Sequence, residues 1–140
     1  TRNLFFTNTH MRTVCICASK KYKKEVSQFC LDLEKLGVVV FEPNINEPIP
    51  EDAFFNSKHV TKTIFKGLTL EHFDWVRKAD VCFVYNQDDY AGVSVSLEMG
   101  YACALGKPIY ALNEKTGDPC RDSLIDKVVS TPAKLAKLLT

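Results

Sequence analysis

A strand–loop–helix–strand unit between residues 81 and 112 most constrains the fold of this chain. Val81 to Tyr85 is a continuous apolar run, and a polar loop containing Gly92 follows it. Residues 93–105 are expected to form a helix, which Gly106-Lys107-Pro108 ends before a second apolar run at 108–112. Apolar runs without polar alternation are typical of parallel strands that are covered on both faces. The unit therefore predicts a parallel sheet with a helical crossover.

The rest of the chain repeats this alternation. We expect further strands at 13–17, 38–41 and 128–129, and helices at 22–36, 68–79 and 132–139. Within helix 68–79, the apolar side chains expected to face inward are Leu70, Phe73 and Val76. Residues 42–67 contain three prolines and are predicted to form a long functional loop. The pattern predicts an α/β fold: one doubly wound, mostly parallel five-stranded sheet in a flavodoxin-like (Rossmann-like) three-layer sandwich, with strand order 2-1-3-4-5.

The first residues differ from the rest. Residues 1–10 match no periodic pattern, and His10-Met11 is the dipeptide that an NdeI cloning site encodes. We therefore expect residues 1–10 to be a leader introduced by cloning or a disordered segment, and residues 11–140 to form a single domain.

Charge and composition narrow the class of partner. The formal net charge is +1, which provides no basic surface for nucleic acid or for an anionic membrane. No apolar run reaches the roughly 20 residues that a membrane-spanning helix needs. The six cysteines contain no Cys-x-x-Cys pair and no matched histidine spacing. We therefore expect reduced thiols, no metal site and a cytoplasmic protein.

Two loops are expected to meet above the carboxyl edge of the sheet, after strands 13–17 and 81–85. The first contains Cys17, Ser19 and Lys20, whose hydroxyl and ammonium donors beside a helix start suit a phosphate or a sugar hydroxyl. The alternative is an ordinary helix cap followed by solvated lysines. The second loop begins at Asn86, and there Tyr90 could stack on a base while Asp89 or its neighbour orients it. The alternative for this loop is a polar turn.

Glu98 is the most informative single residue. It is expected in the first turn of helix 93–105, between the apolar residues Leu97 and Met99. Stabilisation by the helix dipole, worth up to about 1 kcal/mol, is one interpretation. A capping box is excluded because position 95 is valine. The other interpretation is a carbon nucleophile that backbone donors keep ionised in a dry cleft. Local chemistry leaves both open.

The run Gly92-Val-Ser-Val-Ser-Leu-Glu98-Met-Gly-Tyr-Ala-Cys-Ala-Leu-Gly-Lys-Pro-Ile109 resembles the signature of the nucleoside 2-deoxyribosyltransferase superfamily, which includes the deoxynucleoside 5′-monophosphate N-hydrolases. Cys17-Ala-Ser19 is similar to the family's Cys-Gly-Ser. The resemblance implies that Glu98 attacks the anomeric carbon of an N-glycoside, expels the base and forms a glycosyl ester that water or another base resolves. It also implies that the sugar or phosphate is held by Ser19, Ser94, Ser96 and the backbone N–H groups from Gly92 onward.

Two positions depart from the family pattern. His72 stands where the family usually has an aspartate, and Gly92 stands where the transferases have Asp and the monophosphate hydrolases have Ser. His72 has a side chain suited to donating a proton to the leaving base, and could equally be a hydrogen-bonded histidine at a helix edge. Specificity for 2-deoxyribosyl groups therefore does not follow from the resemblance.

The expected function is cleavage of the N-glycosidic bond of a nucleoside or nucleoside 5′-monophosphate. Hydrolysis is favoured over base exchange because Ser19 and Lys20 lie at the phosphate end and position 92 is not Asp. The alternatives are a base-exchanging transferase and a non-catalytic nucleotide-binding module. No cofactor is implied. Superfamily members commonly form dimers in which a neighbouring subunit completes the pocket, which implies a homodimer or higher homo-oligomer with Phe54, Phe55 and Phe65 as candidate contacts.

Overall fold

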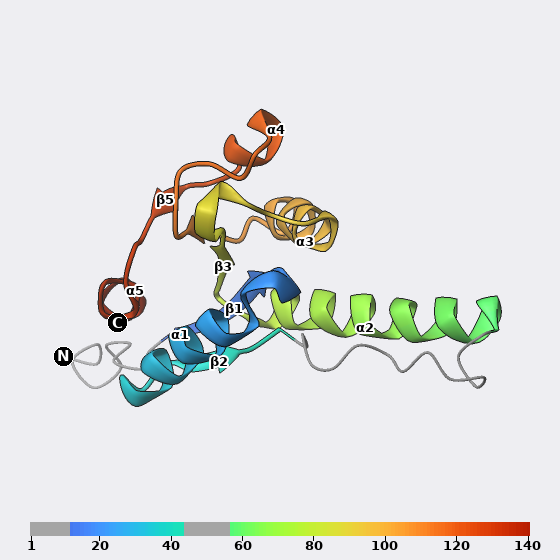
Figure 1. Ribbon diagram of the computed structural model, residues 1–140. Helices are drawn as coiled ribbons and strands as arrows, with labels where there is room; N and C mark the ends of the chain where they lie inside the picture. The colour runs from blue at the N-terminus through green and yellow to red at the C-terminus, as the bar shows by residue number, and fades with distance from the viewer. Residues whose placement is uncertain (1–11, 44–56) are drawn as a thin grey trace.

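Five parallel strands form the centre of the computed structural model, which describes residues 12–43 and 57–140 (Figure 1). The strands are β1 (Thr13–Ala18), β2 (Val39–Phe41), β3 (Val81–Tyr85), β4 (Ile109–Ala111) and β5 (Lys127–Val128). Their order is β2-β1-β3-β4-β5, and each neighbouring pair is parallel. The predicted fold class and strand order are therefore confirmed.

The central strands explain why their sequences lack polar alternation. All five residues of β3 are buried, as are the four inner residues of β1. Helices α1 (Lys23–Lys35) and α5 (Pro132–Leu139) pack on one face of the sheet, and α2 (Lys58–Lys78) and α3 (Val93–Ala104) pack on the other. The central strands are therefore covered on both faces, whereas the edge strands β2 and β5 contain exposed residues.

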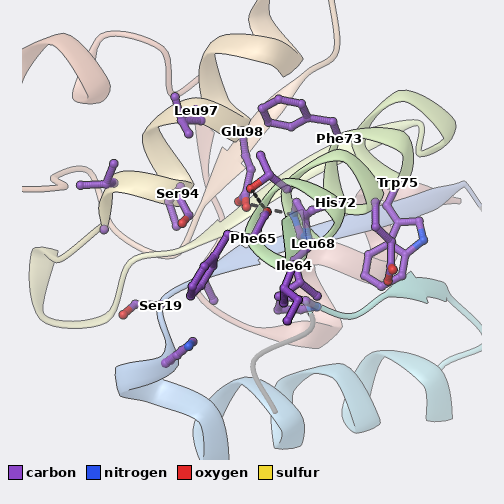
Figure 2. Close-up of a pocket in the computed structure, with 18 residues that line it drawn as sticks. Ser19, Ile64, Phe65, Leu68, His72, Phe73, Trp75, Ser94, Leu97 and Glu98 are labelled. Carbon is purple, nitrogen blue, oxygen red and sulfur yellow. Dashed lines mark hydrogen bonds and ion pairs between the residues drawn. The ribbon is translucent and has the colours of Figure 1, made fainter. Parts of the chain in front are cut away.

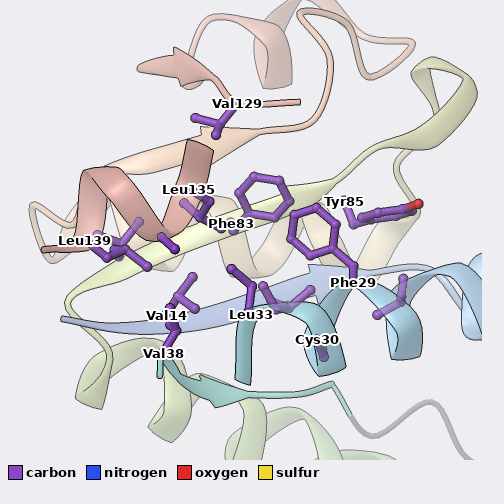
Figure 3. Packing of buried hydrophobic residues seen from close by; sticks show 14 of the residues in the cluster. Val14, Phe29, Cys30, Leu33, Val38, Phe83, Tyr85, Val129, Leu135 and Leu139 are labelled. Atoms are coloured by element: carbon purple, nitrogen blue, oxygen red, sulfur yellow. The ribbon is translucent and has the colours of Figure 1, made fainter. Parts of the chain in front are cut away.

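The α1/α5 face contains a dense apolar core (Figure 3). Phe29 of α1 stacks on Phe83 of β3 with ring centroids 5.0 Å apart, and Leu135 and Leu139 of α5 are fully buried beside them. The short helix α4 (Pro119–Asp122) lies in the connection after β4, where the Asp118 side chain caps it by accepting from the backbone N–H groups of Cys120 and Arg121. Two 3₁₀ turns, η2 (Lys20–Tyr22) and η4 (Gln87–Asp89), follow β1 and β3.

The long helix α2 corrects the prediction for residues 42–67. The helix begins at Lys58, so the predicted loop is wrong from residue 57 onward, and Phe65 lies on the helix. Ser57 caps it, because its side chain accepts from the backbone N–H of Val60 at 3.5 Å. Gly67 and several β-branched residues lower the helix propensity of this segment, which hid it in the sequence. Residues 1–11 and 44–56, including Phe54 and Phe55, lie outside the described residues.

The inward face of α2 also differs from expectation. Val76 is buried as predicted and Phe73 is partly buried, but the side chain of Leu70 is 53% exposed. Leu70 lies two positions before the buried His72, roughly 200° round the helix, and therefore on the side of α2 turned away from the sheet. Among the described helices, none combines the length and the apolar character needed to cross a membrane.

Candidate active site

A cavity of about 560 Å³ opens at the carboxyl end of β1, between α2 and α3. Its polar lining includes Ser19, Lys20, Thr69, Glu71, His72, Ser94 and Glu98. Its apolar lining includes Ile64, Phe65, Leu68, Phe73, Trp75 and Leu97. In Figure 2, Glu98 projects from α3 and His72 from α2 toward each other, and Ser19 lies on the loop below them.

Glu98 lies deeper along α3 than the sequence indicated. The helix begins at Val93, so Glu98 belongs to its second turn, and the first turn contains no acidic residue. Stabilisation by the helix dipole, which fades within the first turn, therefore does not account for this residue. The side chain is buried, and its Oε2 has no hydrogen-bond partner among the described residues. Burial raises the pKa of Glu98 to about 7, and a hydrogen bond with the Cys17 thiol partly opposes the rise.

This environment corrects the expectation that backbone donors keep Glu98 ionised. A carboxylate that loses water and gains only a weak thiol donor favours its protonated form, which is the reverse of a carboxylate held by several N–H groups. At neutral pH the carboxyl group is therefore a mixture of both forms. The ionised form is basic and poorly solvated, and both properties favour nucleophilic attack.

His72 is the nearest ionisable neighbour of Glu98. Its Nε2 lies 3.4 Å from Glu98 Oε2, and 3.5 and 3.4 Å from the sulfurs of Cys15 and Cys17. The side chain is buried, and burial lowers the pKa of His72 to about 4. The imidazole is therefore neutral at neutral pH and carries a single N–H. The sequence left two interpretations of His72 open. This environment fits the hydrogen-bonded histidine better than the proton donor.

The remaining polar lining comes from the loop after β1 and from the start of α3. The Ser19 hydroxyl accepts from the backbone N–H of Lys21 at 3.3 Å, so Ser19 both caps η2 and faces the cavity. Gly92 is the residue that precedes α3, and no side chain caps that helix. Gly92, Val93 and Ser94 all line the cavity, so the uncapped first turn of α3 borders it.

Several residues proposed from the sequence lie outside the cavity lining. Asn86 is fully buried and fixes the end of β3, since its side chain donates to the carbonyl oxygens of Asn113 and Lys115 and accepts from Asn113 N–H. The Ser96 hydroxyl accepts from Arg121 Nη1 at 2.9 Å, which ties α3 to α4. Cys17 lies beneath the cavity in contact with His72.

The loop after β3 turns its aromatic side chain toward η2 instead of the cavity. Tyr90 lies edge-on to Tyr22, with ring centroids 6.3 Å apart, and Lys21 Nζ lies 4.8 Å from the Tyr90 ring centroid. Asp89 is exposed with φ of 57°. Neither Asp89 nor Tyr90 lines the cavity.

Comparison with known proteins decides the family. The family model described as nucleoside 2-deoxyribosyltransferase matches residues 16–127, which is most of the chain. The chain belongs to the nucleoside 2-deoxyribosyltransferase family. The resemblance inferred from the Glu98 segment is thereby confirmed, and the protein is an enzyme of a family that acts on the N-glycosidic bonds of nucleosides.

Solved structures agree with this fold. A 2-deoxyribosyltransferase from Bacillus psychrosaccharolyticus is 24% identical, with a TM-score of 0.59 over 89% of this chain and 90% of that one. A conserved protein from Enterococcus faecalis V583 is 14% identical, with a TM-score of 0.58 over 91% of this chain and 96% of that one. By sequence, no curated protein matches the chain.

The sequence analysis did not predict the apolar wall of the cavity, because it did not predict that α2 begins at Lys58. Ile64, Leu68 and His72 recur at a spacing of four residues, which places them on one side of a helix. That spacing is a signal in the sequence, and extending the helix toward Ser57 would have found it.

A second feature was only partly predictable: the sequence places Cys15 and Cys17 at alternate positions of a predicted strand but does not show what they contact. Cys15, Cys17 and Cys82 are all buried free thiols, and the sulfurs of Cys17 and Cys82 lie 3.4 Å apart. Hydrogen bonds with the thiols of Cys15 and Cys82, together with burial, hold the pKa of Cys17 well above its usual range. The cluster lies directly behind His72 and Glu98, and it forms because β1 and β3 are neighbours.

Proposed function

We propose that this protein hydrolyses the N-glycosidic bond of a nucleoside 5′-monophosphate, with Glu98 as the nucleophile. The observation that carries the proposal is the position of the Glu98 carboxyl group. It is buried in the wall of a 560 Å³ cavity and is paired with no lysine or arginine among the described residues. A carboxylate in such a site has lost the water that would otherwise compete for it.

The reaction proceeds in two steps. A carboxylate oxygen of Glu98 forms a bond to the anomeric carbon while the bond from that carbon to the base nitrogen breaks. The bonding electron pair leaves with the base, which takes up a proton from solvent, and the water that attacks in the second step returns one. Water then attacks the same carbon, the glycosyl ester breaks, and the Glu98 carboxylate is restored with release of the sugar phosphate.

His72 acts as a positioning residue in this scheme. Its neutral imidazole contacts Glu98 Oε2 at 3.4 Å and limits the rotation of the carboxyl group. Protonating His72 is opposed by burial, so donating a proton to the leaving base is the less favoured role. A neutral neighbour also leaves the nucleophile unshielded, whereas a buried ammonium or guanidinium would neutralise it.

The two ends of the cavity suit the two ends of a nucleotide. Ser19, Lys20 and the uncapped start of α3 supply hydroxyl, ammonium and backbone N–H donors for a phosphate. Ile64, Phe65, Leu68 and Trp75 supply apolar and aromatic surface for a base. The cationic end is the reason for favouring a 5′-monophosphate over a free nucleoside.

Base exchange is the second candidate. The matching family model is that of transferases, and the neighbour from Bacillus psychrosaccharolyticus is described as a 2-deoxyribosyltransferase. In that case a second base, instead of water, attacks the glycosyl ester. The two candidates share Glu98 and differ only in the acceptor.

The test is an incubation with a panel of nucleosides and 5′-monophosphates, with and without a second free base, followed by chromatography of the products. Free base from monophosphates without an acceptor supports hydrolysis, and a new nucleoside formed faster than free base supports exchange. Glu98→Gln should lower either rate by about 10³-fold or more. Glu71→Gln, which alters another carboxylate in the cavity lining, is the matched control and should retain activity. Base release that is undiminished in Glu98→Gln would refute the assigned role.

We also propose that a second copy of the chain covers the cavity mouth. Large apolar side chains are exposed around it on α2 and α3: Phe65 (48%), Val93 (79%) and Leu97 (53%). Burying such a patch would stabilise a homodimer. Val93 is the most exposed of these side chains, so Val93→Glu should separate the subunits. Light scattering should give a dimer for the unaltered protein and a monomer for the variant, and a monomer for both would contradict the proposal.

A further inference from the structure

More polar atoms contact His72 Nε2 than this nitrogen can hydrogen-bond. Cys15 and Cys17 occupy alternate positions of β1 and therefore point to the same face of the sheet, toward His72 of α2. The sulfurs of both cysteines and Oε2 of Glu98 converge on one atom, His72 Nε2, at 3.5, 3.4 and 3.4 Å. A neutral ring nitrogen makes one hydrogen bond, as donor or as acceptor. At least two of the three contacting atoms are therefore not hydrogen-bonded to it.

Glu98 provides an independent observation. Its Oε2 is buried and has no hydrogen-bond partner among the described residues. A buried carboxylate oxygen without a partner costs free energy, and a bound cation removes that cost. The oxygen lies 3.4 Å from His72 Nε2, and the Cys17 thiol is hydrogen-bonded to the same carboxyl group, so the oxygen without a partner borders the cluster.

The distances fit a tetrahedral zinc site. Zinc binds thiolate sulfur at about 2.3 Å and imidazole nitrogen at about 2.0 Å, which at tetrahedral angles separates the two ligand atoms by about 3.5 Å. The two S···N distances are 3.5 and 3.4 Å. A carboxylate oxygen at about 2.0 Å from zinc would lie about 3.3 Å from the imidazole nitrogen. The corresponding distance to Glu98 Oε2 is 3.4 Å, although Glu98 is not in the set whose ligand atoms all lie within 4.8 Å of one another.

We propose that Cys15, Cys17 and His72 bind a zinc ion through their sulfurs and Nε2, with the fourth position left for water and the Glu98 carboxyl group nearby. The ligand atoms of the first three residues all lie within 4.8 Å of one another. Two thiolates and an imidazole favour zinc over magnesium or calcium, which prefer oxygen ligands. On binding, the two thiol protons leave to solvent. Cys82, whose sulfur lies 3.4 Å from that of Cys17, remains as a hydrogen-bond donor to the bound thiolate.

Zinc at this position opposes the reaction. The ion occupies the lone pair of His72 Nε2, and its positive charge offsets the negative charge of Glu98, the residue that must attack the sugar. His72 and Glu98 both line the cavity, so the ion reaches the cluster from the side that admits substrate. The inhibitory effect rests on the proposed function of Glu98, whereas the binding of zinc does not. We therefore expect zinc to be a reversible inhibitor.

The binding test uses the full chain, treated with a chelator and then titrated with Zn²⁺ by calorimetry and with Co²⁺ by absorption spectroscopy. One ion per chain is expected, and Co²⁺ should give a thiolate-to-metal charge-transfer band together with the intense visible bands of a tetrahedral centre. Cys17→Ala and His72→Ala should each weaken zinc binding by more than the roughly 10–100-fold that loss of an outer-shell partner costs. The double variant Cys103→Ser/Cys120→Ser removes the exposed thiols and should bind normally.

The outcomes separate the site from adventitious binding. A cobalt spectrum without thiolate bands in the unaltered protein overturns the proposal, and this result does not depend on whether any variant folds. A spectrum lost in Cys103→Ser/Cys120→Ser also overturns it, because the surface thiols would then be the ligands. Circular dichroism of each variant confirms that loss of binding is not loss of fold.

Inhibition is measured separately on base release, with and without zinc and then after adding a chelator. A loss of activity that the chelator restores supports the inhibitory role, and undiminished activity in zinc-loaded protein overturns it. If no substrate is cleaved under any condition while the cobalt spectrum is present, the zinc site stands and the proposed function falls. If base is released and no thiolate band appears, the reverse holds.

Discussion

The two faces of the sheet bury different kinds of side chain. Toward α1 and α5, the central strands present Val14, Ile16, Phe83 and Tyr85, which interdigitate with aromatic and aliphatic residues of the helices. Toward α2 and α3 they present Cys15, Cys17, Cys82 and Val84. The first face fills its volume with large apolar groups. The second uses small side chains and leaves room for His72 and Glu98 to be buried beside a cavity.

This difference shows how the layers divide their roles. The α1/α5 face contributes stability through apolar burial. The α2/α3 face contains a carboxyl group without a hydrogen-bond partner at Oε2 and a histidine whose charged form is disfavoured, and both lower stability to provide a reactive site. Truncating a large side chain on the first face should therefore cost much more stability than truncating one on the second, and replacing Glu98 should raise stability.

The largest effect on stability is expected on the α1/α5 face. Phe83 is fully buried and stacks on Phe29, so Phe83→Ala should lower the free energy of unfolding by about 3–5 kcal/mol. Cys82→Ala, at the adjacent position and on the opposite face, removes little volume and should cost about 1 kcal/mol. Denaturant unfolding measures both. Equal losses would show that the two faces do not differ.

Glu98→Leu should have the opposite sign. It replaces a buried carboxyl group that has no hydrogen-bond partner at Oε2 with an apolar side chain of similar length. The free energy of unfolding should rise by about 1–3 kcal/mol, while catalysis is lost. Tm of chelator-treated protein measures the stability, and base release measures the activity. A fall in Tm would indicate that Glu98 stabilises the fold, contrary to the proposed division of roles.

Lys20→Met tests whether the cavity has a phosphate-binding end. Lys20 lines the proposed phosphate end, and methionine keeps most of its apolar length without the charge. We expect KM for a 5′-monophosphate to rise by about tenfold, the loss of one charge-assisted hydrogen bond, with KM for the matching nucleoside unchanged. Lys24→Met, on an exposed part of α1, is the control. A parallel rise for both substrates would place the phosphate elsewhere.

The smallest effect is expected at Asp80, just before the amino end of β3. Its carboxylate accepts from Thr13 N–H at 2.8 Å and from the Thr13 hydroxyl at 3.1 Å, and the backbone hydrogen bond is the main reason that the pKa of Asp80 is lowered. A lowered pKa in the folded state stabilises the protein above the unfolded pKa, and this contribution is lost as the pH falls through the folded pKa.

Because Asp80 is exposed, its contribution should be below about 1 kcal/mol. Asp80→Asn should lower Tm slightly at neutral pH, and the difference from the unaltered protein should disappear in acid. Thermal unfolding at several pH values measures this. A difference of the same size at every pH would argue against the carboxylate as its source.

The elements that were predictable are those that depend on local pattern. The apolar runs at Val81 to Tyr85 and Val14 to Cys17 identified the central strands, because a strand covered on both faces has no reason to alternate. Gly92 and Gly106-Lys107-Pro108 marked the two ends of α3 in the sequence. The position of Glu98 near the start of this helix, and so beside the cavity, could therefore be predicted. The beginning of α2 was missed because β-branched residues and Gly67 weakened a helix that packing and the Ser57 cap maintain.

By itself, then, the sequence determined the order of strands and helices along the chain and the family, because both are encoded over short distances along the chain. Only the tertiary structure decided that Glu98 is buried in the second turn of α3 with Oε2 unbonded, that His72 is neutral, and that two cysteines of β1 converge on His72 of α2. Burial and contacts between distant segments depend on which elements pack together, and residue spacing does not contain that information.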